Sequence, residues 1–277
     1  MLRLVAIIVL GFTLPLAGVA QEKPNGVDRA FSRLYNFDFV GTHAALNQYI
    51  AVNPADPLGY AVRASAYLFH ELDRLSILES EFFSDDKRIV EKKKLRPDPL
   101  IKAQLFKAID DAQSRAQARL TANPNDQDSL FVMCITTGVL TDYTALIEKK
   151  QIGSLSLVKK STAYAQRLLQ LNPKYYDAYL TTGMAEYLIG SLPFFVRWFV
   201  KVDNVGASKE KGMNTVELVA QKGHYLKPFA KILLAVANLR EKKPRVSEQI
   251  LAGLARDYPE NPLFKKELSQ LTLKLQP

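Results

Sequence analysis

The fold is decided by a stretch that returns in altered form along the chain, Leu46-Asn47-Gln48-Tyr49-Ile50-Ala51-Val52-Asn53-Pro54. Related phrases end at Pro124, Pro173 and Pro259. In each phrase an apolar helical pattern runs into a proline, which ends a helix because it disfavours helical backbone in the preceding residue. A short polar turn and a new amphipathic pattern follow. The repeated unit is therefore a helix, an Asn-Pro turn and a second helix.

Helical periodicity fills the chain between these turns, and no segment has the strict alternation of a strand. With 13 glycines and 14 prolines in 277 residues, 48% of them hydrophobic, the composition excludes a disordered chain and favours a helical globular one. The sequence predicts two short helices within 26–53 and further helices over 57–78, 99–120, 155–171, 208–222, 228–241, 246–257 and 261–275. Because successive helix pairs bury their apolar faces against their neighbours, residues 21–277 are expected to form one all-α domain, an α-solenoid of stacked antiparallel helix pairs.

Residues 173–187 resemble the start of a tetratricopeptide repeat (TPR), in which a proline closes one 34-residue unit and aromatic, Leu, Gly and Tyr positions open the next. The match is carried by Ala178, Tyr179, Thr182, Gly183 and Tyr187, with Tyr60, Ala64 and Tyr67 in the corresponding places after the first turn. Most proline spacings depart from multiples of 34, so insertions or degenerate helices are expected between units. The resemblance implies a TPR-like interaction protein with a concave surface.

The N-terminus has the three-part form of a secretory signal. A short cationic start at Arg3 precedes an apolar run over 4–16 and the small-residue segment 17–20, which predicts cleavage before Gln21. An uncleaved anchor is the alternative, but the run is shorter than the roughly 20 residues that a spanning helix needs. No cysteine lies near the cleavage site. We therefore expect a periplasmic or secreted protein that is not a lipoprotein.

Four tyrosines at the starts of first helices are candidates for a ligand or partner groove: Tyr60, Tyr67, Tyr179 and Tyr187. Helical spacing places them in the core by default. In a solenoid they alternatively point into the concave surface, where a phenol binds a peptide or a small molecule.

A strongly apolar segment follows Pro193, with Phe194, Phe195, Trp198 and Phe199 around two basic residues. A helix of this composition is either packed in the core, placed on a membrane surface or fitted to a ligand or partner groove. It is too short to span a membrane.

The basic charge of the protein is concentrated beside this apolar segment. The formal net charge is +9, and residues 200–245 hold ten lysines and arginines against four acidic residues. The candidates for a basic patch are Lys209, Lys211, Lys222, Lys227, Lys242, Lys243 and Arg245. This surface is either an ordinary solvated face or a docking site for anionic lipid or an acidic protein.

The sequence offers no recognisable catalytic or metal-binding motif. Its three histidines, His43, His70 and His224, are isolated, and Cys134 is the single cysteine. The mixed polar group around Glu71 and Arg74 is interpreted as a structural ion pair. We therefore expect no enzyme activity, no metal and no cofactor. The export signal argues against nucleic acid as a partner, and so does the lack of basic residues interleaved with exposed aromatic ones.

These features predict a non-enzymatic, exported TPR-like scaffold that binds an envelope protein or peptide in bacteria. Two alternatives stay open at this point. One is a small-molecule-binding accessory protein of a periplasmic transport system. The other is a helical protein that associates peripherally with an anionic membrane surface through the apolar segment and the basic patch.

Overall fold

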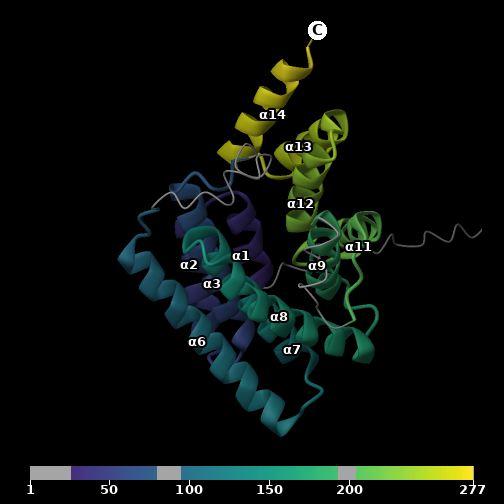
Figure 1. Ribbon diagram of the computed structural model, residues 1–277. Helices are drawn as coiled ribbons and strands as arrows, with labels where there is room; N and C mark the ends of the chain where they lie inside the picture. Colours follow the sequence, from purple (N-terminus) through teal and green to yellow (C-terminus); the bar gives the residue numbers. More distant parts are fainter. Residues whose placement is uncertain (1–25, 80–94, 193–203, 277) are drawn as a thin grey trace, which may run out of the picture.

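The protein is all-helical in the residues that its computed structural model describes, 26–79, 95–192 and 204–276 (Figure 1). Within these ranges the chain forms eleven α-helices and no strand. The α-helices are α1 (Gly26–Tyr35), α2 (Phe39–Val52), α3 (Pro57–Arg74), α6 (Pro99–Ala122), α7 (Gln127–Asp142), α8 (Gln151–Leu171), α9 (Tyr179–Ser191), α11 (Lys209–Lys222), α12 (Lys227–Arg240), α13 (Pro244–Asp257) and α14 (Pro262–Leu275). A π-helical turn, η1 (Tyr143–Ile147), extends α7, and a 3-10 turn, η2 (Tyr176–Ala178), precedes α9.

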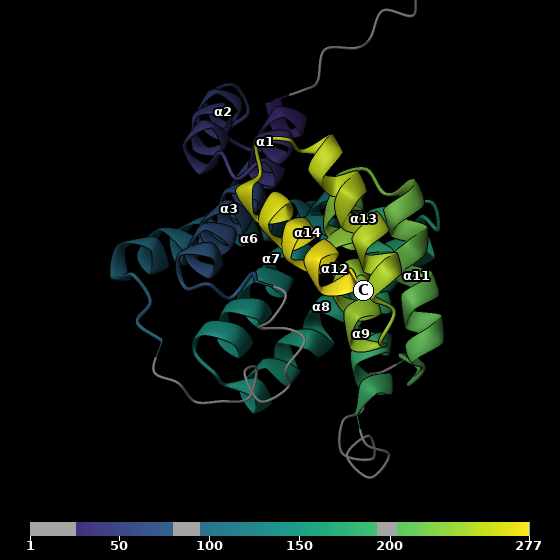
Figure 2. The same ribbon diagram turned by 90° about the horizontal axis from the view of Figure 1, so that it is seen from above.

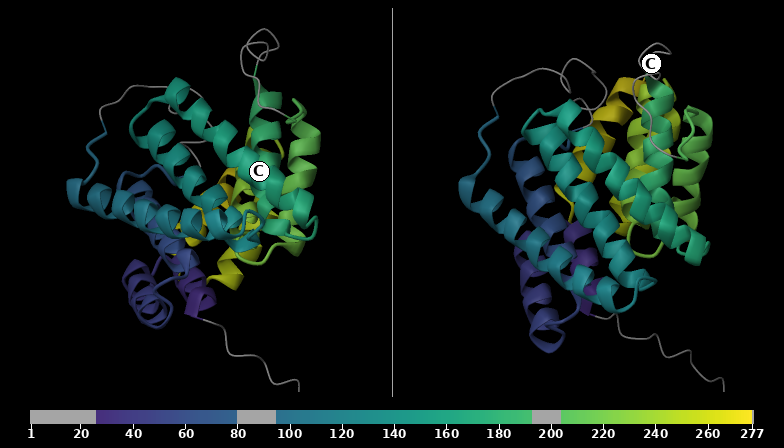
Figure 3. Two further views of the ribbon diagram at one scale, coloured as in Figure 1. Left: turned by 90° about the horizontal axis from the view of Figure 1, so that it is seen from below. Right: turned by 60° about the horizontal axis from the view of Figure 1, so that its bottom comes forward.

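Consecutive helices pack against each other along the chain. The principal pairs are α1 with α2, α3 with α6, α7 with α8, α9 with α11, and α12 with α13. Each pair is also in contact with the next, for example α6 with α7 and α11 with α12. Figure 1 shows the long α6 along one edge of the stack, and Figure 3 shows the molecule from two further sides. The expected all-α, solenoid-like stack of helix pairs is therefore confirmed.

The repeated turns work by capping both helices that they join. At the first turn the peptide N–H of Asn53 donates to Tyr49 and ends α2, and the carboxylate of Asp56 accepts the N–H of Leu58 at the start of α3. Asp126 and Asn261 occupy the same place, two residues after a proline, at the starts of α7 and α14. These side chains satisfy backbone N–H groups that a helix N-terminus otherwise leaves unpaired.

The α9 and α11 helices approach so closely that their contact requires glycine. A Cβ atom on Gly212 would lie 2.7 Å from the carbonyl oxygen of Gly183 on the facing helix. Gly183 meets the side chain of Thr215 in the same way, at 2.9 Å. Gly183 and Gly212 therefore let the backbones of α9 and α11 pack together.

One stretch of the described chain, Gln127–Ile147, is long and apolar enough to cross a membrane by length and composition alone. Its apolar residues are core residues of this fold. Leu130, Phe131 and Val132 are each at most 1% exposed, and they pack against α3, α6 and α8. The hydropathy of this stretch is accounted for by its place between neighbouring helix pairs.

The stack differs from the expected solenoid in one respect, because its first helix contacts its last ones. The hydroxyl of Tyr35 in α1 donates to the carbonyl of Tyr225, at 2.8 Å, and the amide of Asn261 donates to the carbonyl of Tyr35, also at 2.8 Å. The ring of Phe31 stacks on that of Tyr225, with 5.0 Å between centroids. Figure 2 shows α1 beside the connection between α13 and α14. Helix pairs therefore do not pack only against their sequence neighbours.

Candidate functional site

The site that we describe is a solvent-open cavity of about 440 Å³, where the turns of successive helix pairs converge on the segment between α11 and α12. We call it the tyrosine–aspartate cavity. Its lining residues are Tyr49, Asp56, Leu58, Asp128, Phe131, Lys174, Tyr175, Tyr176, Asp177, Lys222, His224 and Tyr225. The cavity thus combines phenol rings with acidic groups and with basic ones.

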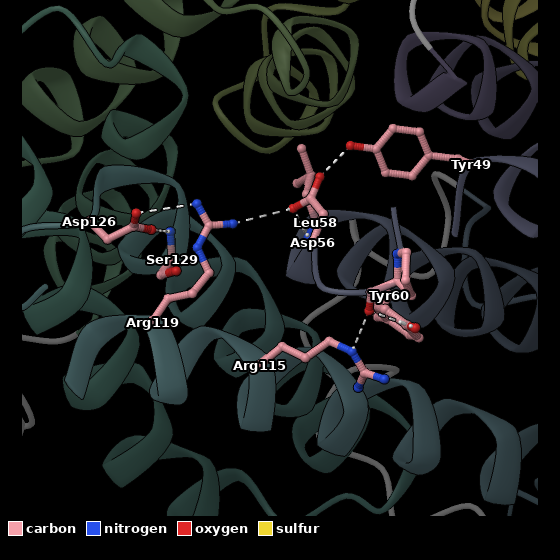
Figure 4. A network of polar contacts seen from close by, with 9 residues as sticks. Tyr49, Asp56, Leu58, Tyr60, Arg115, Arg119, Asp126 and Ser129 are labelled. Carbon is pink, nitrogen blue, oxygen red and sulfur yellow. Dashed lines mark hydrogen bonds and ion pairs between the residues drawn. The ribbon is translucent and has the colours of Figure 1, made fainter. Parts of the chain in front are cut away.

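Arginines from α6 fix the first turn of this cavity (Figure 4). Arg115 and the hydroxyl of Tyr60 both donate to the carbonyl of Pro54, at 2.9 and 3.2 Å. Arg119 lies between two cap carboxylates, 3.8 Å from Asp56 and 3.3 Å from Asp126. In the next unit Arg167 donates to the carbonyl of Pro124 at 2.7 Å. Each of these turns is therefore held by the following unit.

Tyr49 reaches across this turn and donates its hydroxyl to the carboxylate of Asp56 (Figure 4). Burial raises the pKa of Tyr49, and the hydrogen bond to Asp56 raises it further. Burial also raises the pKa of Tyr175 on the third turn, with Asp128 and Asp177 adding to the effect. Both side chains are therefore neutral phenols at physiological pH, available as hydrogen-bonding and ring surfaces.

The opposite wall of the cavity is positioned by Asp177, which is 4% exposed. Its carboxylate accepts the peptide N–H groups of His224, Tyr225 and Leu226, at 3.0, 3.1 and 3.0 Å. Burial raises the pKa of Asp177, whereas these three hydrogen bonds lower it. Asp177 thus fixes the backbone that presents His224 and Tyr225 to the cavity.

A second cavity of about 360 Å³ adjoins the first and shares His224 and Tyr225 with it. Its other lining residues belong mainly to α1 and the α13–α14 connection and include Asp28, Phe31, Tyr35 and Tyr258. The Nε2 atom of His224 lies 3.0 Å from a carboxylate oxygen of Asp28. The contact between the first helix and the 224–226 segment therefore forms the wall between the two cavities.

The four tyrosines predicted as groove residues lie in separate packing contacts, and none of them lines either cavity. Tyr60 is 8% exposed, and the guanidinium of Arg115 lies 4.0 Å from its ring centroid. Tyr67 packs on His43 with 4.3 Å between ring centroids. Tyr179 is half-buried against the core between α9 and α12, and Tyr187 is 3% exposed with its hydroxyl 3.4 Å from Glu241.

Of the two other predicted surfaces, the basic patch lies within the described residues. The apolar segment with Phe194, Phe195, Trp198 and Phe199 lies outside them.

In the basic patch, Lys209 pairs with Glu241 at 2.9 Å and Lys211 with Glu186 at 3.8 Å. Lys227 begins α12. Lys242, Lys243 and Arg245 are exposed around the start of α13. Lys222 is the member of the patch that lines the tyrosine–aspartate cavity, 5.4 Å from the ring centroid of Tyr176.

Residues 26–79, 95–192 and 204–276 contain no group of three or more His, Cys, Asp or Glu side chains that could hold a metal ion. The predicted ion pair is confirmed, because Arg74 binds buried Glu71 through two hydrogen bonds of 2.7 and 2.8 Å. Glu71 also accepts the peptide N–H of Asp98 at 2.7 Å and thus connects α3 to the start of α6. Its role in the described structure is to join these two helices.

Sequence reasoning missed the residues that give the cavity its character, Tyr49, Asp128, Tyr175 and Tyr225. A signal for three of them is present in the sequence. Tyr49 precedes the Asn53-Pro54 turn, Asp128 follows the Asn123-Pro124 turn, and Tyr175 follows the Asn172-Pro173 turn. Because equivalent turns of a helix-pair stack lie at the same end, residues that flank them are expected to meet.

Comparisons with known proteins give a structural likeness. No protein-family model matches the chain. No curated protein matches it either. Among solved structures, the chain is similar to a thermophilic TPR protein of Thermus thermophilus, with 12% sequence identity and a TM-score of 0.48. That match covers 89% of this chain and 97% of the other.

Proposed function

We propose that the protein is an exported scaffold that binds a segment of another envelope protein in its tyrosine–aspartate cavity. The observation that carries this proposal is the cavity itself, in which neutral phenols and charged groups from several helix pairs surround about 440 Å³ of open space. Tyrosine is favoured where proteins bind one another because it offers a large ring, a hydrogen-bonding end and little side-chain entropy. The proposed export rests on the pattern of residues 1–20.

A site-specific cross-linking experiment tests the binding site. A photoreactive phenylalanine analogue replaces Tyr176 in the cavity and, as a matched control, Val40, an 83% exposed residue on α2. We expect the full-length protein in bacterial cells to cross-link to one discrete envelope protein from position 176 and not from position 40. Cross-links that are identical from both positions, or absent from position 176, would contradict the proposal.

The compartment is tested separately. We expect the protein, expressed from its full sequence, to be recovered from the periplasmic fraction or the medium with an N-terminus at Gln21. A protein that stays in the cytoplasm with residues 1–20 attached would contradict export. The cross-linking experiment would still test the binding site independently.

The same cavity favours a second candidate function, the binding of a small molecule as an accessory protein of a transport system. Its mixture of phenol, carboxylate and ammonium groups suits a small polar ligand as well as a peptide. Native mass spectrometry of protein purified from the envelope distinguishes the two. A retained non-protein mass that is lost in a Tyr175→Ala variant favours the small molecule, whereas a cross-linked polypeptide at position 176 favours the scaffold.

A further inference from the structure

One carboxylate of the tyrosine–aspartate cavity is left without a partner. Asp56 accepts hydrogen bonds from Tyr49 and Leu58, and Asp177 accepts three from the 224–226 backbone. Asp128 stands at the exposed rim, and within the described parts of the chain its side chain has neither a hydrogen bond nor an ion pair. A ligand that enters the cavity thus meets one free carboxylate.

Asp128 is not needed to cap its own helix. The N-cap of α7 is Asp126, whose carboxylate accepts the N–H of Ser129 at 2.8 Å and also pairs with Arg119. Partial burial raises the pKa of Asp128, the charge of Asp126 raises it further, and the charge of Arg119 opposes them. The geometry still leaves the Asp128 carboxylate without a direct hydrogen-bond or ion-pair partner among the described residues, so it is open to a ligand.

The rest of the wall around Asp128 is suited to a cation with an apolar stem. Phe131 and Tyr175 line the same cavity with their ring centroids 5.1 Å apart, and Tyr49 contributes a third ring. Aromatic faces attract ammonium and guanidinium groups. The methylene stems of lysine and arginine pack on such rings while their charged ends reach a polar partner. The basic residues of the cavity are Lys174 and Lys222, and Lys222 lies over the ring of Tyr176.

We propose that the tyrosine–aspartate cavity binds a lysine or arginine side chain of the partner segment, which forms an ion pair with Asp128. This inference rests on the proposed function, because it names the chemistry by which that scaffold recognises its partner. The phenols of Tyr49 and Tyr175 pack on the stem of the bound side chain. Asp128 is a specificity residue in this arrangement.

A random peptide library tests the specificity. A phage-displayed library of linear dodecapeptides is selected against the full mature chain and against its Asp128→Asn and Lys222→Gln variants. We expect peptides selected by the native protein to be enriched in lysine and arginine, and the enrichment to disappear with Asp128→Asn. A synthetic copy of a selected peptide should bind Asp128→Asn at least about 10-fold more weakly, the effect of losing one hydrogen-bonded charge pair.

The matched control is Glu210→Gln, which removes another acidic side chain from the first turn of a helix, α11, outside both cavities. It should select the same peptides as the native protein. Asp128→Asn should keep the native circular dichroism and a thermal unfolding temperature at or above the native value, since Asp126 still caps α7. If Asp128→Asn stays folded in this way, its loss of lysine and arginine enrichment reports on binding and not on folding.

Three outcomes would overturn the inference. Lysine and arginine enrichment that persists in Asp128→Asn would remove Asp128 from recognition. A native pool enriched in aspartate and glutamate, and lost with Lys222→Gln, would reverse the polarity of the site while leaving a peptide-binding scaffold in place. A native protein that selects no peptide from the library would count against the proposed function and against this inference together.

Discussion

At the scale of single residues, burial shifts the pKa values of two side chains in opposite directions, one acidic and one basic. Asp142, at the end of α7, is partly buried, and this burial raises its pKa to about 7. His43 packs against Tyr67, its ring nitrogens are buried, and burial lowers its pKa to about 4, with Arg63 and His70 adding to the effect. Both side chains favour their neutral forms in the folded protein, and this makes stability depend on pH.

For Asp142 we expect stability to be lost as the pH rises. The folded protein binds a proton at this carboxyl more readily than the unfolded chain, whose aspartate has an ordinary pKa near 3.9. The free energy of unfolding should therefore fall between about pH 4 and pH 7. Asp142→Asn removes this ionisable carboxyl. The free energy of unfolding of the variant, relative to that of the native protein, should therefore rise across that window, by about 2 kcal/mol above pH 7.

Urea unfolding at a series of pH values measures this difference. Asp110→Asn, on the exposed side of α6, is the control and should differ from the native protein by a constant amount. A difference for Asp142→Asn that is constant, or that shrinks as the pH rises, would contradict the expected burial of the charge.

For His43 the sign is reversed. The unfolded chain binds a proton near pH 6.5, whereas the folded protein does so only near pH 4, so the native protein loses stability as the pH falls through this window. As the pH falls from 6.5 to 4, the free energy of unfolding of His43→Gln should therefore rise by about 1 kcal/mol relative to that of the native protein. A difference between His43→Gln and the native protein that stays constant across this window would show that the effect does not belong to His43.

At the scale of helices, the spacing between α9 and α11 depends on residues without side chains. Glycine in a helix costs about 1 kcal/mol relative to alanine, so Gly212 weakens α11 taken alone. Its value lies in the contact, because a methyl group there would strike the backbone of α9. Gly138 in α7 has no such constraint, since a methyl group would meet only the hydroxyl of Ser161, at 3.9 Å.

These two glycines give a matched pair of substitutions with opposite expected signs. Gly212→Ala should lower the free energy of unfolding by about 2 kcal/mol because the overpacked pair must move apart. Gly138→Ala should raise it by roughly 0.5 to 1 kcal/mol through helix propensity. Urea denaturation measures both, and a Gly212→Ala protein as stable as the native one would mean that α9 and α11 separate without cost.

The helices and the turns between them could be predicted from the sequence, because the signals that start and end a helix are local. The Asn53-Pro54 and Asn123-Pro124 turns and the N-caps two residues after each proline are encoded within a few neighbouring residues, so the helix boundaries follow from them. The turn after Pro173 departs from the pattern, because its Asp177 follows two extra tyrosines. That carboxylate binds the distant 224–226 backbone. Local patterns do not reveal such a partner.

At the scale of the whole molecule, the helix stack is closed by contacts between its two ends. Tyr35 alone connects three segments, through its hydroxyl to Tyr225, its carbonyl to Asn261 and its ring to Tyr258, whose centroid is 5.5 Å away. Lys266 in α14 pairs with Glu79 at 2.7 Å. The candidate cavity depends on this closure for its wall at His224 and Tyr225, which is why sequence patterns predicted the stack and missed the site.

Removing one hydroxyl tests the closure. Tyr35→Phe should lower the free energy of unfolding by about 1 kcal/mol and speed amide hydrogen exchange both in α1 and in residues 224–226. Tyr60→Phe is the matched control, because this buried hydroxyl also donates to a carbonyl, but within its own turn, at Pro54. Faster exchange confined to α1 in Tyr35→Phe would mean that the two ends of the stack are not energetically coupled.

The closed stack also determines when the protein can finish folding. The first helix of the described chain, α1, has two of its aromatic partners, Tyr225 and Tyr258, in segments that are synthesised much later. Until then these partners do not cover Phe31 and Tyr35, and the candidate cavity can be completed only after residues 224 and 225 have been made. A chain interrupted before residue 224 would lack one wall of the cavity and leave its first helix exposed.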